Sequence, residues 1–219
     1  MNEAALQHQL CAGAEALGLS LDTTQIQQLL AYQGLIAKWT KVYNLTAVRN
    51  PEDMLTHHLL DSLAIVSPLQ AHIESMFEPG SKPTLLDVGS GAGLPGVVLA
   101  ICCRALQITC VDAVNKKAAF IRQVALALQL PNLHGLHARI ESITTPFDII
   151  SARAFASLAD FIAGSQAALA PKGVWLAMKG KYPSDEIAEL PSTVEMFHVK
   201  QLQVPGLHAE RWLLWLRRQ

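Results

Sequence analysis

The feature that most constrains the fold is a glycine-rich segment directly after a short apolar run. Residues 85–88 are predicted to form a β-strand, and the residues that follow place glycine at alternate positions, Gly89, Gly91 and Gly93, before a helix that begins near Pro95. Because glycine has no Cβ, a bulky ligand can lie against the backbone there, and the start of the helix offers free amide groups. The order strand, glycine turn, helix predicts an α/β domain that binds a nucleoside cofactor.

The glycine segment alone does not choose the cofactor. Gly91, Gly93 and Gly96 also match the G-x-G-x-x-G pattern of dinucleotide-binding folds, so NAD and S-adenosylmethionine are both open. Asp87 favours S-adenosylmethionine, because a carboxylate at the end of the strand attracts a sulfonium and an amino group but repels a pyrophosphate. Asp112 ends the next predicted strand, where an acid accepts hydrogen bonds from the ribose hydroxyls of either cofactor.

A third cofactor contact is expected after the third predicted strand, where Ile140 and Glu141 stand. The carboxyl ends of parallel strands meet at one edge of the sheet, so residues there can reach a bound base. An aliphatic side chain such as Ile140 can stack on adenine while neighbouring polar groups bind its exocyclic amine. The alternative is that Ile140 simply faces the core.

From residue 85 onward, short apolar runs alternate with helical patterns. Helices are predicted at 96–103, 115–130 and 157–169. Such alternation is typical of a largely parallel sheet with helices on both faces. The last two runs flank Pro205-Gly206 and are expected to pair as an antiparallel hairpin at one edge. Seven strands are predicted, at residues 85–88, 106–112, 134–140, 147–152, 173–178, 194–204 and 212–216.

The first 80 residues are predicted to form a helical extension. Residues 22–43 carry apolar side chains at helical spacing, and Asn50 followed by Pro51 is typical of a second helix start, which extends to about residue 66. The segment 78–83 contains two prolines and a glycine, so it cannot continue a helix. We therefore expect an N-terminal helical extension at 1–80 and a Rossmann-like domain at 81–219, together forming one compact unit.

The composition predicts a folded cytoplasmic protein. Hydrophobic residues make up 51% of the chain and charged residues 16%, which argues against disorder. The N-terminal residues from Met1 to Ala4 lack a basic segment, and no apolar run is long enough for a membrane span, so neither a secretory signal nor a membrane contact is expected. The cysteine spacing and the histidines at 57, 58, 134 and 137 do not form a convincing ligand set, so no metal is expected. We expect a monomer.

Arg153 is the prominent polar residue on the predicted substrate side of the sheet, and it is our catalytic candidate. It follows the fourth predicted strand in the segment 151–157 and can contact a phosphate, a guanine edge or the cofactor, with a surface ion pair as the alternative. That segment lacks the Asn/Asp-Pro-Pro-aromatic signature of amino-group methyltransferases and the Pro-Cys nucleophile of cytosine-C5 enzymes. Guanine N7 suits such a site, because its lone pair attacks without prior removal of a proton.

The overall charge does not indicate a nucleic-acid partner. The formal net charge is −1 and the isoelectric point is about 6.7, so any RNA contact must come from local basic patches. If several of these patches face one side, they can bind phosphates. Three clusters are candidates, namely Lys38, Lys41 and Arg49, then Lys116, Lys117 and Arg122, and finally Lys172, Lys179 and Lys181.

Taken together, these motifs resemble the bacterial small-subunit ribosomal RNA guanine-N7 methyltransferases, also called the glucose-inhibited division protein B family. The likeness covers nearly the whole chain. Its most specific stretches are residues 39–49 (WTKVYNLTAVR), 58–62 (HLLDS) and 87–96 (DVGSGAGLPG), extended by 151–157 and Lys179-Gly180. The chain departs from the family pattern at Thr40, Asn50 and Trp212, where Asn, Asp and His are usual, and these departures leave the cofactor motifs intact.

The resemblance implies a class I S-adenosylmethionine-dependent methyltransferase fold and methyl transfer to N7 of a guanine in the decoding-region loop of 16S rRNA. The partner is then 16S rRNA or the small ribosomal subunit, assembled or assembling. The resemblance also implies cofactor contacts at Gly89, Leu94, Ile140, Glu141 and Arg153. Two alternatives remain open, namely a methyltransferase acting on another RNA or a small molecule, and an S-adenosylmethionine-binding regulator without catalysis.

Overall fold

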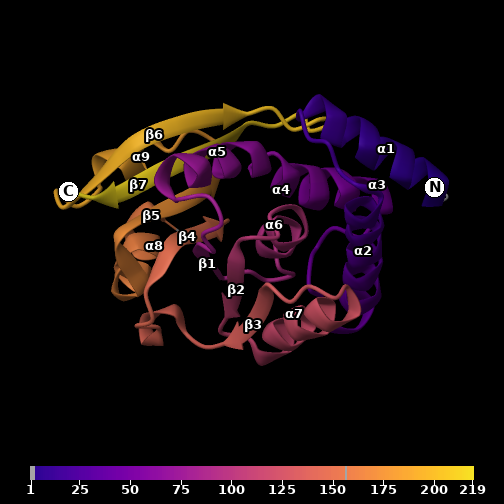
Figure 1. Cartoon of the computed structure of the whole chain (residues 1–219), viewed down its shortest axis with the longest axis horizontal. Coiled ribbons are helices and arrows are strands. Elements are labelled where there is room, and N and C mark those ends of the chain that lie inside the picture. Colours follow the sequence, from indigo (N-terminus) through magenta and orange to yellow (C-terminus); the bar gives the residue numbers. More distant parts are fainter. Residues whose placement is uncertain (1–2, 156) are drawn as a thin grey trace.

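A seven-stranded sheet with the order β3-β2-β1-β4-β5-β7-β6 forms the centre of the protein (Figure 1). The structure is a computed structural model, and it describes residues 3–155 and 157–219. The first five strands are parallel, while β7 pairs antiparallel with both β5 and β6, as the sequence predicts for a terminal hairpin at a sheet edge. The strands are β1 (Thr84–Val88), β2 (Gln107–Asp112), β3 (Leu133–His137), β4 (Phe147–Arg153), β5 (Leu169–Lys179), β6 (Val194–Leu202) and β7 (Arg211–Arg218).

Both faces of the sheet are covered, which explains why its central strands are apolar on both sides. Successive residues of a strand point to opposite faces, so Leu85 joins one hydrophobic core and Leu86 joins the other. The helices α6 (Gly96–Cys102) and α7 (Asn115–Ala127) pack on the first face, and α8 (Leu158–Ser165) packs on the second. The observed architecture is therefore the predicted α/β fold.

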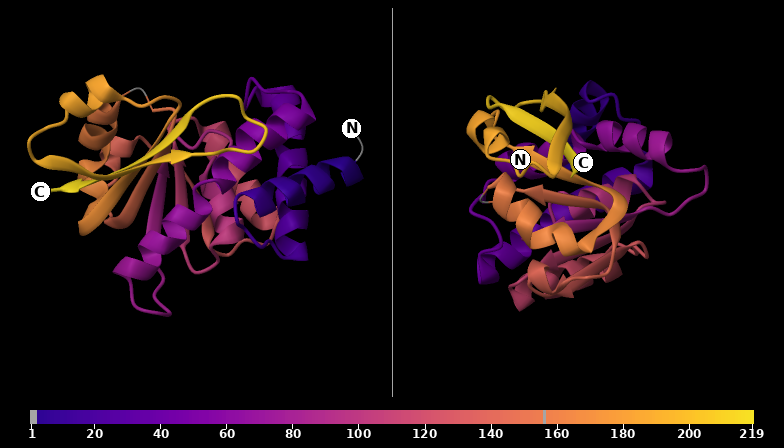
Figure 2. Two further views of the ribbon diagram at one scale, coloured as in Figure 1. Left: turned by 90° about the horizontal axis from the view of Figure 1, so that it is seen from above. Right: turned by 90° about the vertical axis from the view of Figure 1, so that its left-hand side faces the viewer.

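The N-terminal helices extend the first of these cores. Leu29 and Leu59 are buried in the same hydrophobic cluster as Val97 and Phe120, so the helical extension and the sheet share one interior. Figure 2 shows the first two helices at one end of the molecule and the C-terminus at the other. The extension consists of α1 (Glu3–Ala16), α2 (Thr23–Tyr43), α3 (Pro51–Met54), the π-helix η1 (Leu55–Leu60), α4 (Asp61–Leu63) and α5 (Val66–Met76).

The predicted helix starts in this extension are confirmed. Asp22 caps α2, since its carboxylate accepts a hydrogen bond from the Gln25 amide at 2.7 Å while the Gln25 side chain accepts one from the Asp22 amide. Asn50 caps α3, with Pro51 in the first turn. Residues 51–66 do not form the single regular helix that we expected, because a π-helical turn interrupts them. α1 and α5 were not predicted.

The segment after β3 also differs from the prediction. The strand ends at His137, and Ile140 begins a short 3-10 turn, η2 (Ile140–Ser142). α8 is followed by a second 3-10 turn, η3 (Gln166–Ala168), and an unpredicted helix, α9 (Ser184–Ala188), follows β5. Among the described residues, none of the helices combines the length and apolarity needed to cross a bilayer.

Candidate cofactor and acceptor site

The glycine loop after β1 leaves its backbone open. Gly89 and Gly91 have φ angles of 62° and 59°, a left-handed conformation that favours glycine. A Cβ at Gly89 would meet no atom within 4 Å, and one at Gly91 would meet only the Gly89 carbonyl at 3.9 Å. Gly93 differs, because a Cβ there would come within 2.5 Å of Ile121 and Val97. The first two glycines therefore form a cradle that a side chain would fill, and the third allows close packing.

Asp87 lies beneath this loop and not on its open surface. The strand register sets Asp87 between Cys110 of β2 and Ser151 of β4. The fully buried carboxylate accepts hydrogen bonds from the Gly96 amide at 3.1 Å and the Ser151 hydroxyl at 2.9 Å. Burial raises the pKa of Asp87 to about 6, although the bonds from Ser151 and Gly96 act in the opposite direction. Asp87 therefore holds the start of α6 from below, and its predicted attraction for a sulfonium group would act from beneath the loop.

Asp112, at the end of β2, fastens the other side of the loop. One carboxylate oxygen accepts a hydrogen bond from the Gly91 amide at 3.1 Å, and the other accepts one from the Val114 amide at 2.8 Å. The ammonium group of Lys117 lies 3.4 Å from the same carboxylate. Asp87 and Asp112 thus hold the glycine loop from two adjacent strands, and the structure brings these two predicted residues together.

Leu94, Ile140 and Glu141 differ in exposure. Leu94 is buried in the core shared with the N-terminal helices, and Ile140 is buried under α8, where its side chain lies close to Gly164. Glu141 is exposed. The side chain of Ile140 therefore has the core position that we considered as the alternative to stacking on adenine.

Tyr32 of α2 is a loop contact that sequence reasoning missed. Its hydroxyl donates a hydrogen bond to the carbonyl of Ala92 in the glycine loop at 2.6 Å, and the whole side chain is buried. Burial also raises the pKa of Tyr32 well above its usual value, so the hydroxyl stays protonated and remains a donor. The N-terminal extension therefore contacts the glycine loop directly.

Arg153, at the end of β4, is held by one residue of the π-helix η1 and by the first residue of α4. Its Nη1 atom donates to the carbonyl of His57 and to the carboxylate of Asp61, both at 3.0 Å. The same Asp61 carboxylate accepts a hydrogen bond from Nε of Arg211 in β7 at 2.6 Å. Asp61 is only 2% exposed, so one buried carboxylate orients two guanidinium groups. A single π-helical turn between α-helical segments, like η1, is frequent at functional sites.

An open pocket of about 590 Å³ lies in front of these two arginines. Ala154 lines it in the left-handed region with a φ of 59°, an unusual conformation for a residue other than glycine. Lys179 also lines the pocket, and its ammonium group donates to both carboxylate oxygens of Glu186 at 2.7 and 2.9 Å. Both carboxylates in the described lining are therefore already paired, while the lining as a whole is cationic. Ala156, in the predicted segment 151–157, lies outside the described residues.

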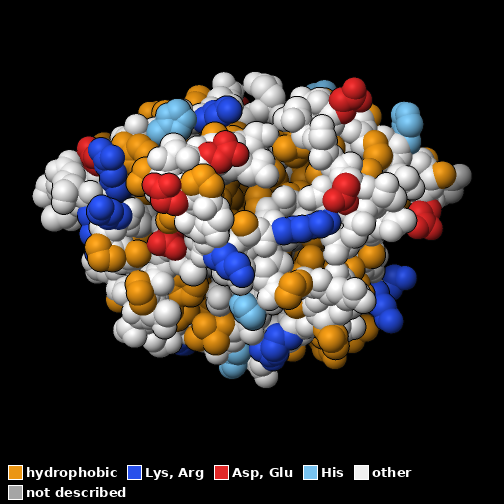
Figure 3. All heavy atoms as spheres, viewed as in Figure 1, with side chains coloured by type: hydrophobic (Ala, Val, Ile, Leu, Met, Phe, Trp, Pro, Cys, Tyr) orange, Lys and Arg blue, Asp and Glu red, His pale blue; other side chains and the backbone are white. Residues whose placement is uncertain are grey.

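Several of the predicted basic residues are engaged in contacts within the protein. Lys117 pairs with Asp112, Lys116 lies 6.0 Å above the Tyr43 ring, and Arg122 donates to the carbonyl of Gly135. On the face shown in Figure 3, the Lys and Arg side chains are interspersed with Asp and Glu and do not form one continuous patch. The basic pocket at the ends of β4 and β5 is thus a local feature.

The histidines at the site have structural contacts. The ring of His58 lies 2.8 Å from the Thr46 hydroxyl, and burial lowers its pKa. His137 bonds to the carbonyl of Ala113. Within residues 3–155 and 157–219, we find no group of three or more His, Cys, Asp or Glu placed to hold a metal ion.

Comparisons with known proteins agree with this geometry. Residues 25–214 match the family model described as rRNA small subunit methyltransferase G. The chain is 66% identical to "Ribosomal RNA small subunit methyltransferase G" of Polaromonas naphthalenivorans over 97% of this chain and 96% of that protein. It is 61% identical to the protein of the same name from Acidovorax sp. strain JS42, covering 99% and 97% of the two chains.

Solved structures share the fold at low sequence identity. TrmN from Thermus thermophilus aligns with a TM-score of 0.54 and 17% identity, over 75% of this chain and 53% of that one. A SAM-dependent methyltransferase from Thiobacillus denitrificans, in complex with S-adenosyl-L-homocysteine, aligns with a TM-score of 0.52 and 13% identity, over 70% and 90% of the chains. These likenesses identify the sheet and its helices as a methyltransferase fold.

Proposed function

Because the chain belongs to the rRNA small subunit methyltransferase G family, we propose that it transfers a methyl group from S-adenosylmethionine to N7 of a guanine in the decoding-region loop of 16S rRNA. The names of the relatives support small-subunit rRNA as the substrate and methyl transfer as the reaction. The choice of N7 depends on two things. One is the chemistry of the pocket in front of Arg153 and Arg211, which we call the acceptor pocket, and the other is the family resemblance of the motifs.

The observation that carries the choice of N7 is the state of the two carboxylates in the acceptor pocket. Asp61 is bonded to two arginines, and Glu186 is paired with Lys179 and accepts the Leu158 amide. Neither is free to remove a proton from an exocyclic amine, and the other titratable groups of the described lining are cationic. The lone pair of guanine N7 needs no base, so positioning of the two reactants suffices.

The glycine cradle fits S-adenosylmethionine. Gly89 and Gly91 leave room for the cofactor against the backbone, and the Asp112 carboxylate is within reach of ribose hydroxyls at the end of β2. Asp87 supplies negative charge beneath the loop, which favours a cationic ligand. We assign the adenine edge to the segment at Ile140 and Glu141, through its backbone and the exposed carboxylate of Glu141, and a further contact to Leu94.

S-adenosylmethionine, when bound, would supply a methyl group on a sulfonium sulfur, and the sulfur would leave as a neutral thioether as the N7 lone pair forms the new bond. Arg153 then stands between the cofactor loop and the acceptor pocket. Its Nη1 atom is fixed by His57 and Asp61, so the remaining N–H groups have a defined direction. They orient the acceptor nucleotide through a phosphate or a guanine edge, or bind the cofactor.

Methylation of purified small ribosomal subunits with radiolabelled S-adenosylmethionine, followed by mapping of the modified base, tests this function. We expect label at N7 of one guanine of 16S rRNA and strong loss of transfer or of cofactor affinity in Arg153→Ala. Full transfer and full cofactor affinity in that variant would exclude the role of Arg153. Parallel reactions with naked 16S rRNA, assembly intermediates and mature subunits identify the form of the substrate.

The same assay separates the alternatives. Cofactor binding without transfer to any RNA would favour a regulator, and label in another RNA or in a small molecule would change the acceptor. Tight NAD binding without affinity for S-adenosylmethionine would overturn the assignment altogether.

The proposed reaction belongs in the cytoplasm, where ribosomal subunits are assembled. We propose that the protein acts there as a monomer. Gel filtration with light scattering tests this oligomeric state.

A further inference from the structure

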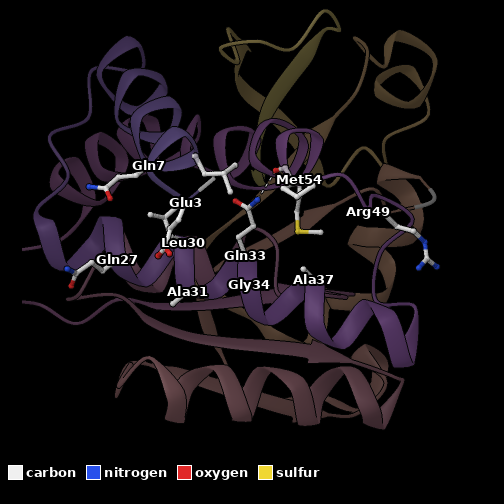
Figure 4. A pocket seen from close by; sticks show the side chains of 12 residues that line it. Glu3, Gln7, Gln27, Leu30, Ala31, Gln33, Gly34, Ala37, Arg49 and Met54 are labelled. Atoms are coloured by element: carbon white, nitrogen blue, oxygen red, sulfur yellow. Dashed lines mark hydrogen bonds between the residues drawn. The ribbon is translucent and has the colours of Figure 1, made fainter. Parts of the chain in front are cut away.

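A second recess lies in the N-terminal extension, away from the glycine loop. It has a volume of about 550 Å³ and opens between α1, α2 and α3 (Figure 4). Small residues on one stripe of α2, Ala31, Gly34 and Ala37, form its floor, while Leu30 and Met54 contribute apolar side chains to its sides. A recess of this size, lined by both apolar and polar side chains, has the dimensions of a small-molecule or nucleobase site.

Gly34 is an unexpected residue in the middle of the 21-residue helix α2. Glycine is less favourable than alanine in a helix interior, so its presence there calls for a packing or functional reason. A Cβ at Gly34 would meet no atom within 4 Å, and the backbone is not in the left-handed region. Neither packing nor backbone geometry in the described structure requires glycine. The free space above Gly34 instead lets a flat group approach the helix backbone.

Gln33 directs a polar atom into the same recess. The side chain is 5% exposed, and its amide nitrogen donates to the carbonyl of Pro51 at 2.7 Å. Its carboxamide oxygen is buried and has no hydrogen-bond partner among the described residues. Figure 4 shows the side chain rising from α2 toward α3, beside Met54. A buried acceptor without a partner is unfavourable, so this oxygen favours a ligand that brings an N–H or O–H donor.

The two ends of the recess differ in charge. In Figure 4, the neutral Gln7 and Gln27 lie at one end and Arg49 lies at the other, while Glu3 lies between Gln7 and Gln33. The Arg49 guanidinium donates to the side chain of Asn44 and forms no ion pair within the described chain. Lys38 and Lys41 continue the α2 stripe, four and seven residues after Gly34. An anionic group of the ligand therefore belongs at the Arg49 end.

We propose that this recess, which we call the α1–α2 groove, binds an unpaired nucleobase of the RNA substrate. The base lies flat over Gly34, a Watson–Crick-edge N–H donates to the Gln33 oxygen, and the adjoining phosphates face Arg49. Every nucleobase has such a donor once it is unpaired, whereas an aliphatic side chain from a protein partner could satisfy neither Gln33 nor Arg49. The inference rests on the proposed function, since it takes RNA as the substrate.

Gly34→Leu tests the groove, because a Cβ at this position meets no atom within 4 Å and the larger side chain occupies the open space above the helix. We expect the KM for small ribosomal subunits to rise about tenfold, the scale of losing one bound base, while kcat and the cofactor Kd stay unchanged. Thr24→Leu is the matched control, since it adds the same side chain to an exposed position of the same helix. If Gly34→Leu kept the wild-type KM while the wild-type protein methylated subunits, the groove assignment would be wrong and the proposed function would stand.

A binding experiment tests the groove without relying on methyl transfer. Fluorescence anisotropy with a labelled single-stranded decaribonucleotide should show weaker binding to both Gly34→Leu and Gln33→Met than to the wild type and Thr24→Leu. Unchanged oligonucleotide binding by both variants would overturn the assignment to an RNA base. A raised KM for subunits together with unchanged binding of naked RNA would do the same, because it would point to a protein segment in the groove.

Discussion

Replacing Asp87 by asparagine is expected to stabilise the protein and to weaken cofactor binding. Asparagine has the shape of aspartate, so its oxygen can accept the Gly96 amide while its nitrogen donates to the Ser151 hydroxyl. The hydrogen bonds beneath the loop are thereby kept and only the charge is removed. The effect of that charge on stability and on affinity can then be measured separately.

The size of the stability effect follows from the raised pKa of Asp87. A carboxyl group whose pKa rises from 3.8 to about 6 on folding stabilises the folded state in its neutral form, and this stabilisation is lost as the pH rises through 6. Above that pH, the ionised group costs about 3 kcal/mol relative to the unfolded chain. Between about pH 5 and about pH 7.5 the carboxyl group is already ionised in the unfolded chain, whereas in the folded protein it still loses its proton. About 1.4 kcal/mol of the total loss falls in this interval.

Urea unfolding of the wild type and Asp87→Asn at several pH values measures this effect. The advantage of the variant in free energy of unfolding should grow by about 1.4 kcal/mol from about pH 5 to about pH 7.5. Calorimetry should show weaker binding of S-adenosylmethionine to the variant, and a smaller loss for S-adenosylhomocysteine, whose sulfur is neutral. A stability difference that does not change with pH would refute the reasoning, since the other groups titrate alike in both proteins.

Two further substitutions probe how the N-terminal extension supports the site. Tyr32→Phe removes the hydroxyl that donates to the Ala92 carbonyl. We therefore expect about 1 kcal/mol less stability and a raised Kd for the cofactor, with kcat unchanged at saturating cofactor. An unchanged Kd would contradict a role of Tyr32 in holding the loop. Asp61→Asn weakens the hydrogen bonds to Arg153 and Arg211. We therefore expect about 2 kcal/mol less stability in urea unfolding and a raised KM for subunits. Wild-type values of both quantities would contradict the role of Asp61 in positioning the two arginines.

Local sequence patterns account for the parts of the site that were predicted. The turn at Gly89 and Gly91 needs left-handed backbone angles, and glycine is the residue that adopts them freely, so the loop was recognisable from composition and spacing. The place of Asp112 at the end of a strand was also visible in the sequence, while its contact with a ribose stays a prediction. The caps at Asp22 and Asn50 act within three residues of themselves, so they marked the helix starts correctly.

Contacts between distant segments account for what was missed. The burial of Asp87 depends on the alignment of three strands, and the sequence of one strand does not specify its neighbours. The bond between Asp61 and Arg211 joins residues that are 150 positions apart. A lone acid within the apolar run 59–63 was the available signal for Asp61, whereas nothing local distinguished Arg211 from an exposed arginine.

The order of strands in the sheet limits how the chain can fold during its synthesis. β6 is synthesised before β7 but lies outside it, so β6 emerges before the strand that becomes its inner neighbour. The sheet cannot therefore grow outward strand by strand as the chain leaves the ribosome. Because Arg211 is the first residue of β7, Asp61 can bond to its second arginine only after β7 has been synthesised. The acceptor pocket is thus completed only once β7 has emerged, by a non-local step, while the glycine loop can form much earlier.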